Sequence, residues 1–183
     1  MNKTDLSGYT TGSFSTGAGV LKRTLWYYVN LLFFISPVLP ISSLKVALLR
    51  IFGAKIGRGV VIKPAVNIKY PWKLSIGDFS WIGEKAWIDN LDQVSIGSNC
   101  CISQGAMLLC GNHNFKKAGF DLITKPIVLE EGAWIGAHSV VCPGVICKSH
   151  SVLAVNSVAT TDMEPYFIYQ GNPAVKTKER KIE

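Results

Sequence analysis

From Ile56 onward an aliphatic or similarly sized residue returns every six positions, and this spacing limits the possible folds more than any other feature. The repeat makes two short slips and one long break, and it resumes at Leu129. It occupies Ile56, Ile62, Ile68, Ile76, Ile82, Ile88, Ile96, Ile102, Leu108, Leu129, Ile135, Val141, Cys147, Leu153 and Ala159. Neither the helical period of 3.6 nor the strand period of two produces it. A period of six is typical of solenoids in which a strand and a turn form one face of a triangular coil.

Three faces close one coil, so the repeat predicts about five coils with the repeated residue pointing inward and stacking on its neighbours. The position four places later is small or modest, at Val60, Val66, Ser80, Ala86, Cys100, Ala106, Ala133, Ser139, Val145, Ser151 and Ser157. The position three places later is expected to be a corner with positive φ, which Gly, Asn, Asp and His tolerate best. Its occupants of these types are Gly59, Asn99, Gly105, Gly132, His138, Gly144, His150, Asn156 and Asp162.

The chain divides into a segment 1–54, a solenoid 55–163 with an extruded loop 109–126, and a C-terminal extension 164–183. After a polar start, the first segment predicts one helix that stops before Pro37 and a second that Gly53 ends. The prolines interrupt the apolar run well short of the ~20 residues that cross a bilayer. We interpret the helices as a cap on the open first coil. The alternative is peripheral membrane contact through residues 25–52.

Composition excludes several function classes. The formal charge is +7, but the basic residues gather only at Lys176, Lys178, Arg180 and Lys181, so nucleic-acid binding is not favoured. The five cysteines do not have the spacing of paired metal ligands. We interpret them as packing residues of a protein in a reducing compartment. Cys110, beside the loop, is the alternative catalytic cysteine. We see no secretory signal and expect a cytoplasmic location, at the inner face of the membrane if the helices touch lipid.

Of the three histidines, His138 and His150 fall at corners, where structure alone explains them. His113 lies where the repeat breaks and the loop begins. Loops on a rigid scaffold often carry chemistry, although a lone loop histidine is also commonly just solvated.

From Pro71 to Ala174 the chain resembles the colanic-acid-biosynthesis branch of the hexapeptide acetyltransferases. The resembling segments are PWKLSIGDFSWIGEKAWI, CISQGAMLLCGNH, WIGAHSVVCPGV and GNPA. The resemblance implies a left-handed parallel β-helix, against the usual right-handed crossover. It also implies acetyl-CoA as co-substrate, no metal, and a homotrimer with three intersubunit sites. The family's catalytic base is a histidine at the start of the loop, and Gly111-Asn112-His113 matches that position.

Acyl transfer from a thioester to a sugar hydroxyl needs a base, and imidazole titrates near neutrality. The second ring nitrogen needs an acceptor, for which Asp89 or Asn90, one coil below His113, are candidates. The other interpretation of both residues is that they belong to the turn at 90–95. No cysteine or serine has a base beside it in the repeat, so we expect direct transfer in a ternary complex.

By resemblance, Ala137 and Val155, one coil apart, contact the pantetheine arm of the coenzyme, with Trp134 on the same wall. Thr160 and Thr161 match the positions that follow. The relatives commonly read Thr-Lys there, so Thr161 departs from the pattern, and Lys178 or Arg180 is expected to supply the missing phosphate contact. The outward Trp81 and Trp87 are expected to bind the sugar together with Asn112, or to lie in the subunit interface.

The expected acceptor is a sugar hydroxyl of a polysaccharide or its precursor. Serine, an amino sugar or an antibiotic are alternative acceptors, because this fold identifies the donor better than the acceptor. A zinc lyase resembling the gamma-class carbonic anhydrases is disfavoured, since the repeat separates the three histidines that would have to converge on the metal. A non-catalytic scaffold remains the other alternative.

Overall fold

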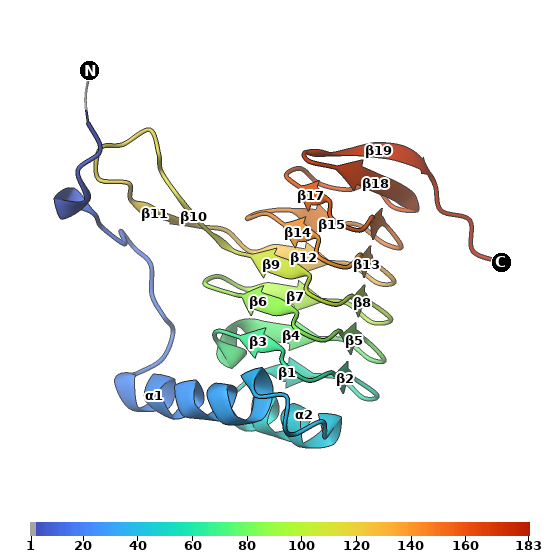
Figure 1. Cartoon of the computed structure of the whole chain (residues 1–183), viewed down its shortest axis with the longest axis horizontal. Coiled ribbons are helices and arrows are strands. Elements are labelled where there is room, and N and C mark those ends of the chain that lie inside the picture. The colour runs from blue at the N-terminus through green and yellow to red at the C-terminus, as the bar shows by residue number, and fades with distance from the viewer. Residues whose placement is uncertain (1–2) are drawn as a thin grey trace.

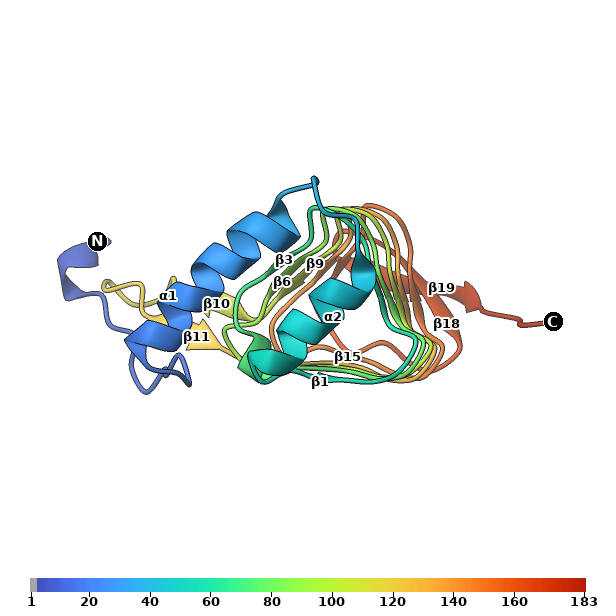
Figure 2. The same ribbon diagram turned by 90° about the horizontal axis from the view of Figure 1, so that it is seen from below.

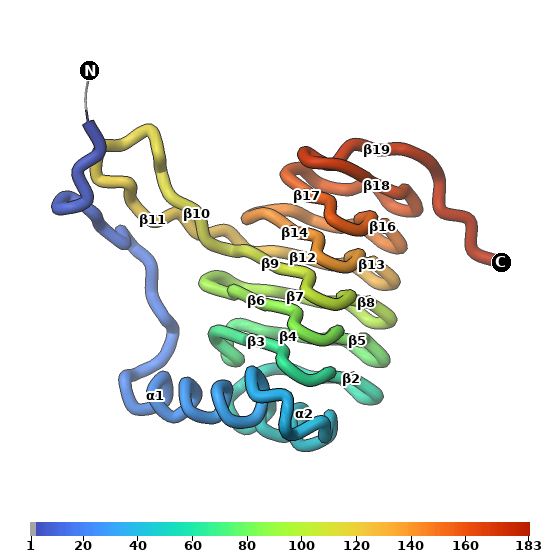
Figure 3. Tube along the Cα trace, in the orientation of Figure 1, coloured from blue at the N-terminus to red at the C-terminus, as the bar shows by residue number. Residues whose placement is uncertain are grey.

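The computed structural model describes residues 3–183 and shows a left-handed parallel β-helix, a triangular prism with three sheets as its sides (Figures 1 and 3). Sheet A contains β1 (Lys55–Ile56), β4 (Leu74–Ile76), β7 (Val94–Ile96), β12 (Ile127–Leu129) and β15 (Ile146–Cys147). Sheet B contains β2 (Val61–Ile62), β5 (Trp81–Ile82), β8 (Cys101–Ile102), β13 (Trp134–Ile135), β16 (Val152–Leu153), β18 (Phe167–Gly171) and β19 (Ala174–Glu179). Sheet C contains β3 (Asn67–Ile68), β6 (Trp87–Asp89), β9 (Met107–Leu109), β14 (Val140–Val141) and β17 (Val158–Ala159).

The six-residue repeat forms the core as predicted. In sheet B, for example, Ile82 pairs with Ile102 and Ile135 pairs with both Ile102 and Leu153. All fifteen repeated residues are buried except Ile56, which is half-buried in the first coil. Each such aliphatic side chain contributes about 1.5–3 kcal/mol by leaving water. The predicted five coils are confirmed, and β18 adds the start of a sixth on sheet B.

The small residues four places later are all buried too. Two of the serines bond across coils: the Ser80 hydroxyl donates to the Gly97 carbonyl at 2.7 Å, and the Ser139 hydroxyl to the Ala154 carbonyl at 2.6 Å. Ser80 and Ser139 therefore satisfy their hydroxyl groups inside the prism, whereas the buried Ser151 hydroxyl has no hydrogen-bond partner among the described residues.

Eight of the nine predicted corner residues have positive φ. Asp162 does not, so that prediction is wrong: the chain leaves the repeat there to pair Met163 with Cys147, and the Asp162 carboxylate accepts from the Ile146 N–H. Three further corners have positive φ without a tolerant side chain, namely Ala65, Phe79 and Lys85.

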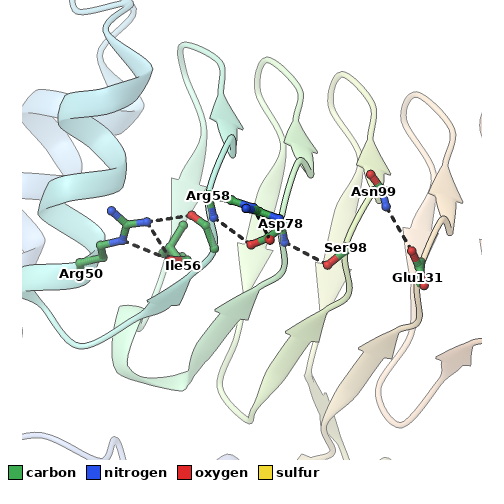
Figure 4. A network of polar contacts seen from close by, with 8 residues as sticks. Arg50, Ile56, Arg58, Asp78, Ser98, Asn99 and Glu131 are labelled. Carbon is green, nitrogen blue, oxygen red and sulfur yellow. Dashed lines mark hydrogen bonds and ion pairs between the residues drawn. The ribbon is translucent and has the colours of Figure 1, made fainter.

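Polar contacts run along the edge between sheets A and B and tie successive coils together (Figure 4). The Asp78 carboxylate accepts from Arg58, from both its backbone N–H and its guanidinium, and the Asn99 amide donates to Glu131. At the first coil, the Arg50 guanidinium donates to the carbonyl oxygens of Ile56 and Gly57. This edge is therefore a structural ladder.

Two helical segments cover the open first coil, as the cap interpretation predicted (Figure 2). They are α1 (Val20–Val29), which continues into the π-helical η2 (Asn30–Ile35), and α2 (Ser42–Ile51). Trp26 is buried and donates from its indole N–H to the Ile68 carbonyl at 2.9 Å. The buried Lys45 ammonium donates to the Lys63 carbonyl at 2.9 Å. The helices therefore supply donors to carbonyl groups that the first coil leaves unpaired.

The loop 109–126 extends from the edge between sheets C and A as an antiparallel hairpin of β10 (Gly111–His113) and β11 (Leu122–Thr124). Beside it lies the N-terminal strap, residues 3–19, which contains the short η1 (Leu6–Gly8) (Figures 1 and 3). The Asp5 N–H donates to the Ala118 carbonyl at 2.9 Å, and the Leu122 N–H to the Thr10 carbonyl at 3.1 Å. The remaining short element, η3 (Pro71–Lys73), lies on the same edge. Within residues 3–183 the helices are too short, or too polar, to cross a bilayer.

Candidate functional site

His113 lies at the end of β10 with its ring held by the loop and the strap. The ring stacks on Phe120, with centroids 4.4 Å apart and planes 9° apart, and Tyr9 lies 5.9 Å away. Its Nδ1 atom is 3.0 Å from the Phe120 carbonyl oxygen. Since a carbonyl oxygen only accepts, Nδ1 of the neutral ring carries the proton, and Nε2 keeps its lone pair. That is the arrangement a general base requires.

Asp89 and Asn90 are buried one coil below the root of the loop. The Asp89 carboxylate forms an ion pair with Lys69 at 2.9 Å, and the Asn90 amide bonds to the backbone of Tyr70. Neither side chain hydrogen-bonds to the His113 ring within residues 3–183. The expectation that one of them orients the ring is therefore wrong for contacts within one chain, because β10 carries His113 outward to the Phe120 carbonyl.

A cavity of about 600 Å³ lies between the strap, the loop and the prism. Asn114 and Leu122, the chain neighbour and the strand partner of His113, line it, whereas the His113 side chain does not. Its lining is mostly polar and includes Thr10, Ser13, Asp92, Asn114, Asp121 and Thr124. Lys73 lies on one wall and donates to the carbonyl oxygens of Ser15 and Leu91, both at 2.6 Å. Burial lowers the pKa of the Lys73 ammonium. Hydroxyl, amide and carboxylate groups of this kind suit a polyhydroxylated ligand.

Three expected coenzyme residues share one wall of the prism. Ala137 and Val155 lie at the edge between sheets B and C, where the Asn156 N–H donates to the Ala137 carbonyl at 2.9 Å. Trp134 is on β13, just before that edge, and its indole N–H donates to the Ser103 hydroxyl at 2.9 Å. The exposed Val155 and Trp134 side chains give this wall an apolar, accessible surface.

The other expected coenzyme residues lie elsewhere. Thr160 and Thr161 follow β17 at the edge between sheets C and A, and Lys178 on β19 pairs with Ile168. The Arg180 guanidinium donates to the carbonyl oxygens of Gly132 and His150, at the edge between sheets A and B. The structure of one chain therefore does not bring these four residues to the wall of Ala137 and Val155.

Trp81 and Trp87 point outward, as expected, but from different sheets. Trp87 borders an aromatic cavity of about 330 Å³ with Tyr27 and Tyr70, whereas Trp81 borders one of about 260 Å³ beside Ser103. The two rings therefore do not share one surface within a chain, and their expected roles, in sugar binding or in the subunit interface, stay predictions. The Asn112 side chain accepts from the His113 N–H at 2.8 Å.

The surroundings of Cys110, His138 and His150 suit a role in packing. Cys110 is buried, and burial raises the pKa of its thiol to about 12, so the thiol stays protonated at neutral pH. His150 stacks on Tyr166 with centroids 4.7 Å apart, and His138 covers Gly105. Each of the three histidines occupies a different edge of the prism. Among the described residues, no three His, Cys, Asp or Glu side chains are grouped to hold a metal ion.

Sequence reasoning missed Tyr9 and Phe120, which hold the ring of His113. Both lie in aperiodic segments, where no repeat indicates which face a side chain takes. The only available signal was their aromatic character near the loop.

The residues expected to form the site are divided within one chain. His113 lies at the edge between sheets C and A, whereas Ala137 and Val155 lie at the edge between sheets B and C. The expected base and the expected coenzyme residues therefore do not meet within a single chain.

Comparison with known proteins places this arrangement among acetyltransferases. The chain is 35% identical over 176 residues to WcaF of Escherichia coli, named as a colanic acid biosynthesis acetyltransferase, covering 96% of this chain and 97% of the relative. It is 28% identical over 130 residues to the galactoside O-acetyltransferase of the same species, covering 69% of this chain and 64% of that protein. A search with family models found no match.

Solved structures show the same fold. A hexapeptide-repeat acetyltransferase from Vibrio cholerae superposes with a TM-score of 0.80 at 24% identity, covering 88% of this chain and 92% of that one. A second structure of that protein, complexed with acetyl coenzyme A, gives a TM-score of 0.79 at 23% identity, covering 91% and 92%. A maltose O-acetyltransferase from Clostridium difficile gives a TM-score of 0.80 at 18% identity, covering 89% and 88%.

Proposed function

Because the chain belongs to the colanic acid biosynthesis acetyltransferases of the hexapeptide-repeat family, we propose that it acetylates a sugar hydroxyl of a polysaccharide or its precursor. The chain is an acyltransferase, and acetyl-CoA is its co-substrate. The observation that carries the proposal is the His113 ring: Nδ1 is held by the Phe120 carbonyl, Nε2 has no hydrogen-bond partner among residues 3–183, and the same loop lines a polar cavity. The cavity supports a carbohydrate acceptor, because its hydroxyl, amide and carboxylate groups can pair with several sugar hydroxyls.

In the proposed reaction, Nε2 of His113 takes the proton of the sugar hydroxyl while that oxygen attacks the thioester carbonyl. The new C–O bond forms and the C–S bond breaks, and the leaving thiolate recovers the proton from the imidazolium. The Phe120 carbonyl accepts from Nδ1 and stabilises the imidazolium that forms between these steps. Transfer is direct in a ternary complex, because Cys110, the nearest buried thiol, has no activating partner and a raised pKa.

The active unit is a homotrimer in which each site lies between two copies. The support is the separation of His113 from the wall of Ala137 and Val155 on different edges of one prism. A threefold assembly places the loop edge of one copy against the coenzyme edge of the next and closes after three copies. The same assembly leaves room for Thr160, Thr161 or Lys178 of one copy to reach coenzyme bound to another.

Mixing inactive subunits tests this arrangement. His113→Ala lacks the base, and Val155→Trp obstructs the coenzyme wall, so each homotrimer is inactive. If sites form between copies, equal mixing restores about a quarter of the wild-type sites, those with the base from one variant and the wall from the other. No recovery after verified subunit exchange contradicts the intersubunit site.

We place the reaction on the cytoplasmic side, at the inner face of the membrane, where acetyl-CoA and lipid-linked sugar precursors meet. The support is the apolar N-terminal helices, which remain exposed after capping the prism. The test of the overall function is thiol release from acetyl-CoA with a panel of sugars, followed by NMR of the surface polysaccharide after gene deletion. An unchanged O-acetyl signal in the polymer contradicts the proposed acceptor.

A further inference from the structure

The capping helices carry apolar residues on two sides, but only the inner side packs against the first coil. The inner side buries Trp26, Phe34, Val46 and Leu49 against the first coil. The outer side of the cap, including the connection before α2, exposes Val20, Leu21, Leu25, Tyr28, Leu31, Leu32, Val38, Ile41 and Ile51. A cap helix that meets only water carries polar residues on its outer side. The outer side is therefore unexplained by capping.

Helical spacing gathers part of this surface into one stripe. Leu21, Leu25, Tyr28 and Leu32 follow one another at steps of four, three and four residues, so they line one side of the continuous α1–η2 segment. Leu21 is 74% exposed and Leu32 is 57% exposed. We call these four residues the outer stripe. It lies at the end of the prism remote from β18 and β19 (Figure 1).

The capped end of the molecule has an excess of basic residues. Residues 6–77 contain nine Lys or Arg, and no Asp or Glu. Of the nine, Lys45 is buried, Arg58 and Lys69 pair with Asp78 and Asp89 of the second coil, and Lys73 bonds to carbonyl groups beside the loop. The other five, without a carboxylate partner among the described residues, are Lys22, Arg23, Arg50, Lys55 and Lys63. An apolar surface with an excess of cations around it complements a layer of anionic headgroups over acyl chains.

We propose that the outer stripe is an interfacial membrane-binding surface, with its apolar side chains between the headgroups of an anionic bilayer. The helices lie on the bilayer, since they are too short to cross it. A second copy of the chain is the less favourable occupant of this surface. Two copies meeting through the same patch would bring two ends with an excess of basic residues together, and like charges repel.

The surface gives the enzyme an orientation, a consequence that rests on the proposed function and trimer. Three parallel prisms present three outer stripes in one plane, so weak single contacts combine into stronger attachment. The prism then stands on its capped end, and the loop with His113 lies a fixed number of coils above the lipid surface. Lipid-linked acceptors would reach every loop at the same height.

Vesicle sedimentation with the full chain tests the surface. We expect binding to vesicles of phosphatidylcholine with phosphatidylglycerol, and much weaker binding to phosphatidylcholine alone. Leu21→Gln, Leu25→Gln and Leu32→Gln, combined in one variant, should lower the partition coefficient on the mixed vesicles at least about tenfold. These side chains are exposed, so the variant should retain its melting temperature. The matched control is Val175→Gln, at the far end of the molecule and 61% exposed.

Each outcome decides the proposal. Equal binding of the triple variant and the control, or equal binding to both vesicle types, overturns it. A triple variant with a smaller oligomeric state but unchanged vesicle binding shows that the outer stripe contacts another copy of the chain. That result also overturns the membrane proposal. Acetyl transfer to a soluble sugar should be unchanged in the triple variant. A protein that binds vesicles but transfers no acetyl group refutes the proposed function while leaving the membrane surface standing.

Discussion

The contact between Gly119 in the loop and Gly8 in the strap allows a test of how the cavity between the strap, the loop and the prism is closed. A Cβ atom at Gly119 would lie 2.6 Å from the Gly8 carbonyl oxygen and 3.1 Å from the Asp121 carboxylate. The first of these is backbone, so Gly119→Ala must push the strap away from the loop. A Cβ atom at Gly8 meets only the Cα of Gly119 at 3.9 Å, which is ordinary contact. Gly8→Ala is therefore the matched control.

The size of the effect follows from the hydrogen bonds that join the strap to the loop. They are Asp5 N–H to the Ala118 carbonyl, Leu122 N–H to the Thr10 carbonyl, and Thr10 N–H to the Asp121 carboxylate, at 2.9, 3.1 and 3.3 Å. Each exposed bond contributes roughly 0.5–1 kcal/mol. Losing two of the three weakens strap docking by about 1–2 kcal/mol, which corresponds to about 5- to 30-fold.

Hydrogen exchange and steady-state kinetics measure this effect. In Gly119→Ala, the amides of Asp5, Thr10 and Leu122 should exchange about 5- to 30-fold faster, and KM for the acceptor should rise in proportion. KM for acetyl-CoA should change less, because the strap hydrogen-bonds to the loop and not to the proposed coenzyme wall of Ala137 and Val155. Exchange rates equal to those of Gly8→Ala would refute the strap contact. Faster amide exchange with an unchanged acceptor KM would instead show that docking of the strap does not contribute to acceptor binding.

Three further predictions concern the coenzyme wall, the cysteine and the corners. Val155→Trp should raise KM for acetyl-CoA at least about 100-fold with little change in the acceptor KM, so that almost no activity remains at subsaturating acetyl-CoA. An unchanged KM removes Val155 from the wall. Cys110→Ala should retain most activity. Alkylation of Cys110 in the wild type should accelerate only as the pH rises towards about 12, because burial disfavours the thiolate. Fast alkylation at neutral pH contradicts this. Gly105→Ala should destabilise the fold by about 1–3 kcal/mol in urea titrations, since φ is +66° and the new Cβ would lie 2.5 Å from the His138 ring. Adding His138→Ala should recover the part due to the clash, and no recovery leaves backbone strain as the whole effect.

The period of six predicted the core because each coil imposes the same requirement. An inward residue such as Ile102 must stack on Ile82 below and Ile135 above. Apolar residues therefore recur in the sequence at a fixed spacing. The corners were less predictable. Phe79 and Lys85 have positive φ because strand pairing on both sides imposes the turn, whatever the side chain.

The expected site residues were predicted only in part, because only the periodic segments indicate where a side chain lies. His113 was noticed because it lies where the repeat breaks, and the alignment of Ala137 with Val155 followed from the 18-residue coil. The Phe120 carbonyl and Tyr9 act from segments without a period, where sequence spacing carries no information on direction. Trp81 and Trp87 lie on different sheets because a step of six residues moves the chain by one face around the prism.

The central claim is that His113 is the general base of acetyl transfer, and His113→Ala tests it most directly. The account predicts that kcat/KM falls at least about 100-fold, while calorimetric binding of acetyl-CoA and the oligomeric state remain those of the wild type. His138→Ala, at another edge of the prism, should retain most activity in the same assay. A His113→Ala enzyme of near wild-type activity, or an inactive His138→Ala with active His113→Ala, would contradict the assignment of the base.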